Sequence, residues 1–378
     1  MSSVSAAAEL DALLRTAVAE GVTPGCAAAV WREGELRLRS FVGCLDGAPE
    51  SAPVTADTAY DLASLTKILS TTTLTAQAID AGALRLDDRL PEALAVVGGF
   101  RPQLRDLLEH AAGLEAHREF FAPPWSLGPG QREAFLDAVR GVAPACPPRA
   151  RAIYTDLGFA LLGAWLERAL GARLDALFAE RIAEPLGLAG QIGFRPLDRS
   201  YDDALTFPVT EAYDRGEPQT WWPIRARVGQ AAARGVVHDD NCVVMHGVAG
   251  HAGLFGTLDA VLAVARAWLE ARLPGVDPQR CPALVERFFT PSTVPGSTRR
   301  LGFDGVSTDP SGTPSGGSTG GVLSPASVGH LGFTGTSVWI DPPARSIYVL
   351  LANRVHPSRA DTRIRALRPA FHRLAAKL

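Results

Sequence analysis

A serine and a lysine three positions apart form the clearest chemical signal in this 378-residue sequence. Ser64 and Lys67 lie in the stretch Ser64-Leu65-Thr66-Lys67, at the start of a segment that we expect to be helical. Residues three apart share one face of a helix, so the hydroxyl and the ammonium would be neighbours. A serine hydroxyl is a weak nucleophile and needs a base within hydrogen-bond reach. The pair therefore predicts a nucleophile beside a group that can accept or relay its proton.

Lysine is scarce elsewhere in the chain, which strengthens the interpretation that Lys67 has a specific chemical role. Lysine occurs only at Lys67 and Lys377, so arginine supplies 35 of the 37 basic residues. Arginine stays charged in proteins, whereas an ammonium with a reference pKa of about 10.4 can lose its proton when it is partly buried. We interpret Lys67 as a position where arginine would not serve; the alternative is an ordinary surface lysine.

Two later stretches contain further polar groups that could join this pair. The first is Tyr154-Thr155-Asp156, directly before an apolar helical segment, where a tyrosine on its own would usually be a packed core aromatic. The second runs from His330 to Thr336, with the sequence His-Leu-Gly-Phe-Thr-Gly-Thr. His110, His246 and His251 lack the spacing with cysteines or carboxylates that a metal site needs, so they are expected to be structural.

Together these stretches resemble the motif set of the serine β-lactamase and penicillin-binding protein superfamily, in its class C-like branch. Ser64 to Lys67 matches the S-x-x-K motif, and Tyr154 to Asp156 resembles the Y-x-N motif. His330 to Thr336 is similar to the H-T-G form of the K-T-G strand motif. The motifs come in family order, and supporting likeness covers nearly the whole chain at Leu107–Leu114, Glu184–Leu188 and Gly250–Phe255.

The resemblance implies a role for each of the first three residues. Ser64 would be the nucleophile, with Lys67 accepting or relaying its proton. Tyr154 would come from a helical domain to the opposite side of Ser64, deprotonate it and later protonate the leaving group. The N-terminus of the helix would also favour negative charge that develops near Ser64.

The same resemblance implies a substrate-facing strand. The backbone N–H groups of Ser64 and Phe333 would form an oxyanion hole. His330, Gly332 and Thr334 would contact the substrate beside it, and Asp156 would do so from the other side.

Two residues depart from the family pattern. Asp156 stands where the familiar motif has asparagine, whose amide can donate to a substrate carbonyl; an ionised aspartate only accepts. A carboxylate at this position should also hold Lys67 charged and shift the task of the base toward Tyr154. His330 stands where relatives that act on β-lactams have a lysine that meets the carboxylate of the drug, and a mostly neutral histidine grips an anion less well. Arg354 or another arginine is an alternative source of that contact.

A second serine motif is rejected. Gly316 to Gly320 satisfies G-x-S-x-G around Ser318, but a nucleophile elbow needs a buried strand before the serine and a helix after it. Here a loop rich in glycine, serine, threonine and proline, spanning 307–327, surrounds Ser318. Ser318 is therefore not expected to be a nucleophile.

The elements that must position these groups follow from apolar periodicity. Helices are expected at 6–20, 64–81, 157–170, 174–182 and 260–273, and a last amphipathic helix carries Ile364, Leu367, Phe371 and Leu374. Strands are expected at 25–31 and 36–43, as a hairpin, and at 337–340 and 347–351. These elements predict a mixed α/β (α+β) fold of the β-lactamase/transpeptidase-like type, with an antiparallel sheet flanked by N- and C-terminal helices. Residues 1–80 and 291–378 would form this domain, and 81–290 a mainly helical inserted domain.

Composition narrows the possible partners and locations. A net charge of −3 without basic runs argues against nucleic acid. The N-terminus has no basic n-region and no apolar stretch reaches membrane-spanning length, so we expect a cytoplasmic protein without a membrane partner. Five cysteines without a C-x-x-C pair favour reduced thiols. No metal or cofactor is expected, and the oligomeric state is left open.

The leading hypothesis is a serine hydrolase that forms an acyl-enzyme with a small-molecule ester, an amide or a D-amino-acid peptide. A class C-type β-lactamase or penicillin-binding protein, with a β-lactam substrate, is the alternative among enzymes. A catalytically inactive member that binds a ligand is less favoured, because Ser64, Lys67 and Tyr154 are all present.

Overall fold

A six-stranded antiparallel sheet forms the centre of the computed structural model, which describes residues 3–201, 204–212, 232–309 and 311–378. Each strand pairs with its neighbours in antiparallel register. The first strand, near the N-terminus, lies directly beside the last strand of the chain, with Ala29 opposite Val349. The strand order is β2 (Glu35–Gly43), β1 (Gly25–Arg32), β11 (Ser346–Ala352), β10 (Ser337–Asp341), β9 (Val328–Leu331) and β8 (Asp304–Gly305).

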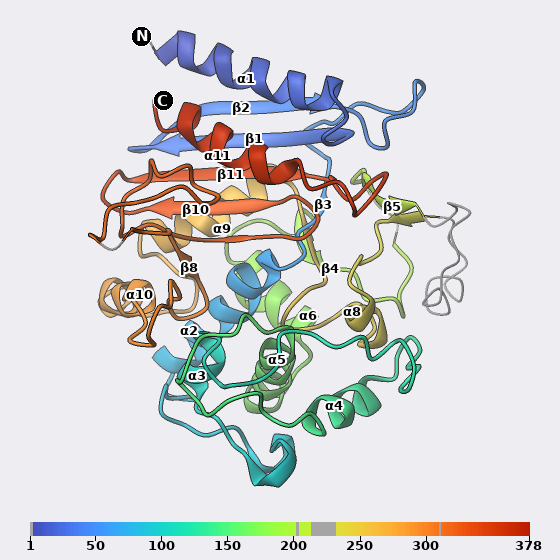
Figure 1. Ribbon diagram of the computed structural model, residues 1–378, viewed down its shortest axis with the longest axis vertical. Helices are drawn as coiled ribbons and strands as arrows, with labels where there is room; N and C mark the ends of the chain where they lie inside the picture. The colour runs from blue at the N-terminus through green and yellow to red at the C-terminus, as the bar shows by residue number, and fades with distance from the viewer. Residues whose placement is uncertain (1–2, 202–203, 213–231, 310) are drawn as a thin grey trace.

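Both faces of this sheet are buried by helices. Successive residues of the central strands point to opposite sides, so each strand contributes side chains to both faces. On β11, Tyr348 and Leu350 pack with the terminal helices α1 (Ser3–Ala19) and α11 (Ile364–Ala375). Val349 belongs to the larger core on the other face, where α9 (Leu258–Leu269) lies against the sheet. Figure 1 shows α1 and α11 together on one side of the strands, with both chain ends nearby.

The remaining elements lie mainly below the sheet in Figure 1. A small sheet has the order β3 (Tyr60–Asp61), β7 (Leu254–Gly256) and β4 (Ile192–Phe194), and β5 (Val209–Ala212) pairs with β6 (Ala232–Arg234). The longer helices here are α2 (Thr73–Asp80), α4 (Arg132–Arg140), α5 (Asp156–Leu170) and α10 (Cys281–Phe289). Shorter helices are α3 (Leu104–Leu108), α6 (Leu174–Phe178) and α8 (Asp240–Val244). The described residues also contain single turns of π-helix, η1 (Lys67–Thr72) and η4 (Ala179–Ala183), and of 3₁₀-helix, η2 (Glu92–Leu94) and η3 (Val97–Gly99).

The structure confirms the expected hairpin, the expected strand pair β10 and β11, and the antiparallel sheet flanked by helices from both ends of the chain. The expected helix from Ser64 is present as a continuous helical run that includes η1 and α2. The division into 1–80 with 291–378 and 81–290 stays a prediction, and α9 cuts across it by packing on β1, β10 and β11. In the part of the chain that the structure describes, no helix is long and apolar enough to cross a membrane.

Candidate active site

Ser64 follows a tight turn that leaves strand β3. Ala63 has a positive φ of 47°, a conformation that is uncommon for a residue with a Cβ. The side chain of Asp61 holds this turn, accepting from the Ala63 N–H (2.8 Å) and from the His238 N–H (2.7 Å). The backbone strain is thus stabilised by a buried carboxylate, and Ser64 is placed at the entrance of the helical run that begins at Leu65.

Lys67 is completely buried beside Ser64 and donates three hydrogen bonds. Its Nζ lies 2.9 Å from Ser64 Oγ, 2.8 Å from Asp156 Oδ1 and 3.1 Å from the backbone oxygen of His251. An ammonium has three protons, so all of them are directed to acceptors. In this state Lys67 donates to the Ser64 hydroxyl and has no lone pair to accept its proton.

Opposing influences set the pKa of Lys67. Burial acts to lower it, but the Asp156 carboxylate and Tyr154 outweigh burial, so the pKa is raised above its usual value. Burial likewise acts to raise the pKa of Asp156, but Lys67 and the hydrogen bond with His117 prevail and hold it well below its usual range. The ion pair expected between Asp156 and Lys67 is therefore present, and it keeps both groups charged.

Asp156 is held in place by the start of α5. The hydroxyl of Thr155 caps this helix by accepting from the Gly158 N–H (3.2 Å), so Asp156 occupies the first helical turn, where a negative charge is favoured. The Asp156 N–H donates to the oxygen of Ala116 (2.9 Å). His117 Nδ1 lies 3.3 Å from Asp156 Oδ2 and fixes the second oxygen.

The ring of Tyr154 is surrounded by cations and imidazoles. Lys67 Nζ and the Arg299 guanidinium each lie 5.0 Å from its centre. The rings of His110 and His330 lie 4.6 Å and 5.6 Å away. Burial raises the pKa of Tyr154 above its usual value, although the positive charge of Lys67 acts in the opposite direction. Tyr154 is therefore a neutral phenol at pH 7, in surroundings that would stabilise a phenolate if one formed.

His330 lies on strand β9 and is buried and neutral. Its Nδ1 is 2.8 Å from the oxygen of Leu331, so Nδ1 carries the proton and Nε2 has a lone pair. Burial, followed by Lys67 and Arg299, lowers the pKa of His330 to about 3. The imidazole therefore contributes an acceptor to the site and no positive charge, as the sequence predicts.

The turn after β9 presents backbone donors next to Ser64. Within the described part of the chain, the N–H groups of Ser64 and Phe333 have no hydrogen-bond acceptor, as an oxyanion hole requires. Gly332 is needed here because a Cβ would lie 2.0 Å from Thr336 Oγ1. Thr334 does not line the site: its buried hydroxyl donates to the oxygen of Asp61 (2.7 Å) and joins this turn to the one that carries Ser64.

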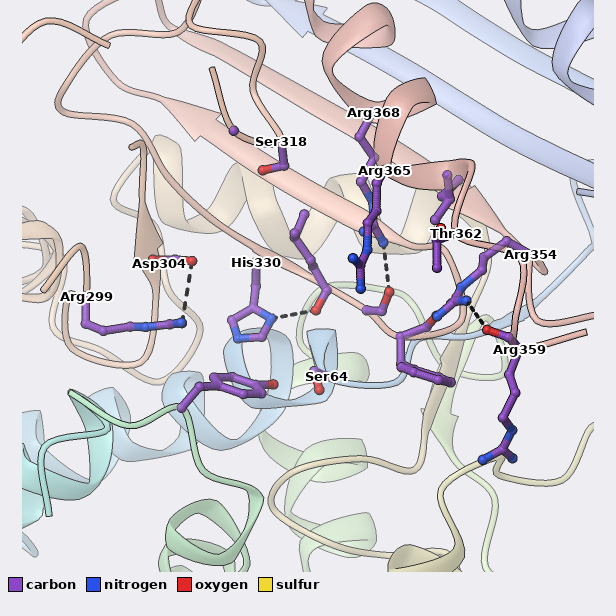
Figure 2. Close-up of a pocket in the computed structure, with 16 residues that line it drawn as sticks. Ser64, Arg299, Asp304, Ser318, His330, Arg354, Arg359, Thr362, Arg365 and Arg368 are labelled. Atoms are coloured by element: carbon purple, nitrogen blue, oxygen red, sulfur yellow. Dashed lines mark hydrogen bonds and ion pairs between the residues drawn. The ribbon is translucent and has the colours of Figure 1, made fainter. Parts of the chain in front are cut away.

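Ser64 opens onto two cavities. The larger has a volume of about 710 Å³ and is walled by β9, its following turn, the loop around Ser318 and the start of α11 (Figure 2). The smaller, of about 310 Å³, contains the acidic side chains Glu119, Asp156, Asp239 and Asp240. Such volumes suit small organic substrates. Ser318 lies in a turn at the wall of the larger cavity without a helix after it, in accord with its rejection as a nucleophile.

Several residues at the site were missed by sequence reasoning or were expected to be structural. His110 accepts from the Thr155 N–H (3.0 Å) and packs on Tyr154, and the oxygen of His251 accepts from Lys67. His117, Arg299 and Asp61 had not been singled out. His117 and Arg299 come from distant parts of the chain, so no local spacing could have shown that they reach Ser64. Asp61 is only three residues before Ser64, and its spacing to the Ala63 N–H was the one local signal available.

Comparisons with known proteins agree with this geometry. A family model described as Beta-lactamase matches residues 10–370. A protein of Escherichia coli (strain K12) named "Putative D-alanyl-D-alanine carboxypeptidase" is 28% identical over 319 residues, 81% of this chain and 71% of that protein.

Two solved structures show the same β-lactamase/transpeptidase-like fold. One is described as "EstCE1, a hydrolase with promiscuous acyltransferase activity" and superposes with a TM-score of 0.72 at 20% identity, covering 99% of this chain and 98% of that one. The other is an octameric penicillin-binding protein homologue from Pyrococcus abyssi, with a TM-score of 0.68 at 18% identity, covering 95% and 75%.

Proposed function

Because the chain belongs to the beta-lactamase family of serine hydrolases, we propose that it hydrolyses a small ester, amide or D-amino-acid peptide through an acyl-enzyme on Ser64. The observation that carries the proposal is the contact of 2.9 Å between Ser64 Oγ and the buried Lys67 Nζ, with Tyr154 packed over it. In this reaction Ser64 Oγ attacks the carbonyl carbon. The N–H groups of Ser64 and Phe333 bind the oxygen on which negative charge develops.

Tyr154 first releases its phenolic proton to solvent, and the phenolate then takes the proton of Ser64. Lys67 is an unsuitable base while its three protons are directed to Ser64, Asp156 and His251. Its charge, together with Arg299 on the Tyr154 ring, lowers the cost of a phenolate. Tyr154 then gives a proton to the leaving group, and a water molecule attacks the ester formed on Ser64 in a second, equivalent half-reaction.

Relatives support this reaction class and leave the substrate open. The curated relative is named for a carboxypeptidase on D-alanyl-D-alanine, and one structural neighbour is described as a hydrolase with acyltransferase activity. Asp156 removes the amide donor that relatives offer to a β-lactam, which favours substrates that do not need it. A class C-type β-lactamase stays the alternative, because arginines in the larger cavity could meet the carboxylate of a drug.

Pre-steady-state hydrolysis of p-nitrophenyl butyrate tests the proposal. The expected result is a burst of p-nitrophenol of about one per enzyme molecule, if release of the acyl group is the slower step. A panel of short-chain esters, D-amino-acid amides and a chromogenic β-lactam would then rank the substrate classes. Failure to turn over any of them, with no burst, would favour an inactive ligand-binding protein.

A further inference from the structure

The larger cavity at Ser64 has an unusual excess of positive charge. Its wall contains five arginines and a single carboxylate, that of Asp304. Figure 2 shows Arg299 beside Asp304 on one side, and the other four arginines gathered near the start of α11. The arginines are Arg299, Arg354, Arg359, Arg365 and Arg368.

Ion pairs account for two of these charges. Arg299 lies 3.5 Å from Asp304, and Arg359 lies 2.7 Å from Glu211. Pairing of this kind neutralises most of the field of a guanidinium at a distance. Each of these two arginines is therefore matched by one carboxylate, although Arg299 still acts at close range on His330.

The other three arginines have no carboxylate partner within ion-pair distance among the residues that the structure describes. Arg354 donates to the backbone oxygens of Phe333 (2.8 Å) and Asp361 (2.9 Å). Arg368 donates to the backbone oxygen of Gly332 (2.8 Å), and its buried Nε has no partner. The exposed Arg365 is directed from α11 toward the cavity (Figure 2).

These three cations repel one another. Burial, followed by Arg354 and Arg365, lowers the pKa of Arg368 to about 10. Burial and then Arg365 also lower the pKa of Arg354. Grouping like charges around a partly buried guanidinium costs stability, and the more distant carboxylates of Asp361 and Glu211 offset it only in part, since the pKa of Arg354 is still lowered. The carboxylate of Asp361 pairs instead with Arg363 (2.6 Å).

We propose that the cluster of Arg354, Arg365 and Arg368 selects substrates that carry a compact, doubly negative group; this proposal rests on the proposed function. The group would be either a dicarboxylate or a phosphate monoester. A single carboxylate would leave a net positive charge of about two in the cluster, whereas a dianion leaves about one. Guanidinium groups match both chemistries, because their planar donors bind carboxylate and phosphate oxygens in pairs. The same cavity holds Ser64, so the dianion lies on the molecule whose acyl bond is cleaved.

Equilibrium binding tests this cluster without any need for turnover. Succinate, inorganic phosphate and acetate would be titrated into the wild-type protein and Ser64→Ala by calorimetry at matched ionic strength. We expect the dianions to bind with a Kd on the order of tenfold or more below that of acetate, and more weakly at high salt. Whether succinate or phosphate binds more tightly distinguishes the two sources of the dianion.

Variants on one helix provide the matched comparison. Arg365→Gln should raise the Kd of the preferred dianion on the order of tenfold, because it removes charge-assisted hydrogen bonds. Arg365→Lys should retain most of the affinity. Arg373→Gln, on the exposed side of the same helix and outside the cavity wall, should bind like the wild type.

Kinetics supply an independent readout. The preferred dianion should raise the KM of p-nitrophenyl butyrate and leave kcat unchanged, since it occupies the substrate cavity. Equal binding of acetate and the dianions, or an identical loss in Arg365→Gln and Arg373→Gln, would overturn the proposal. Because binding by Ser64→Ala is measured directly, a failure of the cluster to bind is distinguishable from a failure of Ser64 to act as nucleophile.

Discussion

Replacing Asp156 by asparagine would remove one charge from the site and keep its shape. Asparagine retains an oxygen that can accept from Lys67, now 2.8 Å from Asp156 Oδ1. Among the described residues, Asp156 is the one carboxylate within ion-pair distance of Lys67. Without it, burial would be opposed mainly by Tyr154, and the pKa of Lys67 should fall.

The size of this fall can be bounded. An opposite charge within about 4–6 Å shifts a pKa by roughly 1–3 units, so the pKa of Lys67 should fall by about that amount. Each unit corresponds to about 1.36 kcal/mol of differential interaction. In the variant, neutral Lys67 becomes available as a base at a lower pH than in the wild type.

Activity against pH would report this change. In the wild-type enzyme the pKa values of Lys67 and Tyr154 are both raised, so kcat/KM for p-nitrophenyl butyrate should still be rising above pH 9. In Asp156→Asn the ascending limb should move to lower pH by about 1–3 units. Glu119→Gln is the matched control, since it removes a carboxylate from the same smaller cavity without an ion pair to Lys67.

The free energy of unfolding should also depend on pH through this ion pair, with Lys67 and Asp156 losing their stabilising effects at opposite ends of the pH range. The raised pKa of Lys67 in the wild type stabilises the fold below the unfolded value of about 10.4 and ceases to do so as pH rises through the folded pKa. The lowered pKa of Asp156 stabilises the fold at pH values above the unfolded pKa of about 3.9. This stabilisation is lost as pH falls through the folded pKa. Breaking a buried pair costs about 3–5 kcal/mol, and neutralisation of Lys67 would reduce this cost. The loss in free energy of unfolding should therefore be largest between these limits.

An unchanged pH profile in Asp156→Asn, with urea unfolding equal to that of the wild type at pH 7, would refute this reasoning. It would mean that Asp156 does not hold Lys67 charged. An equal shift in Glu119→Gln would show that the effect reflects the general field of the cavity.

Three further predictions concern the same site. Lys67→Arg should lose on the order of 10² or more in kcat/KM, nearly as much as Lys67→Ala, because arginine keeps the charge and loses the compact donor that can titrate; an active Lys67→Arg enzyme would show that charge alone suffices. The wild type should hydrolyse p-nitrophenyl butyrate with a much higher kcat/KM than nitrocefin. Asp156→Asn restores an amide donor, so it should reduce the ratio of these two kcat/KM values about 10- to 10²-fold by improving nitrocefin hydrolysis. Efficient nitrocefin hydrolysis by the wild type, with no higher kcat/KM in the variant, would contradict this. Gly332→Ala should lower the free energy of unfolding by about 1–3 kcal/mol and impair turnover, because its Cβ would lie 2.0 Å from Thr336 Oγ1; a wild-type urea midpoint would argue against the required close approach.

Much of the fold was predictable because strongly periodic segments bury a regular face. The strands β1, β10 and β11 are nearly continuous apolar runs, and the helices α5 and α9 are long. Strands of two or three residues, such as β3 and β8, bury too little to leave a pattern. The π-helical turn that contains Lys67 was not predicted, because apolar periodicity does not distinguish a single π-helical turn from α-helix.

The candidate site was predictable only where its chemistry is local. Ser64 and Lys67 share a helical face, so their contact follows from spacing alone. Asp156 was expected near Lys67 from the resemblance, and the ion pair is present. Arg299 and His251 reach the site by long-range folding. The arginines at α11 required knowledge of how the last helix packs on the sheet, which brings Arg368 to the oxygen of Gly332 in the turn after β9.

Mapping the covalent adduct on Ser64 tests the central claim most directly. The wild-type enzyme would be treated with a fluorophosphonate, digested and analysed by mass spectrometry, beside Ser64→Ala. We predict one added group on the peptide that contains Ser64, and no labelling or hydrolysis by Ser64→Ala at an unchanged melting temperature. Labelling of another residue such as Ser318, or near wild-type turnover by Ser64→Ala, would contradict the account.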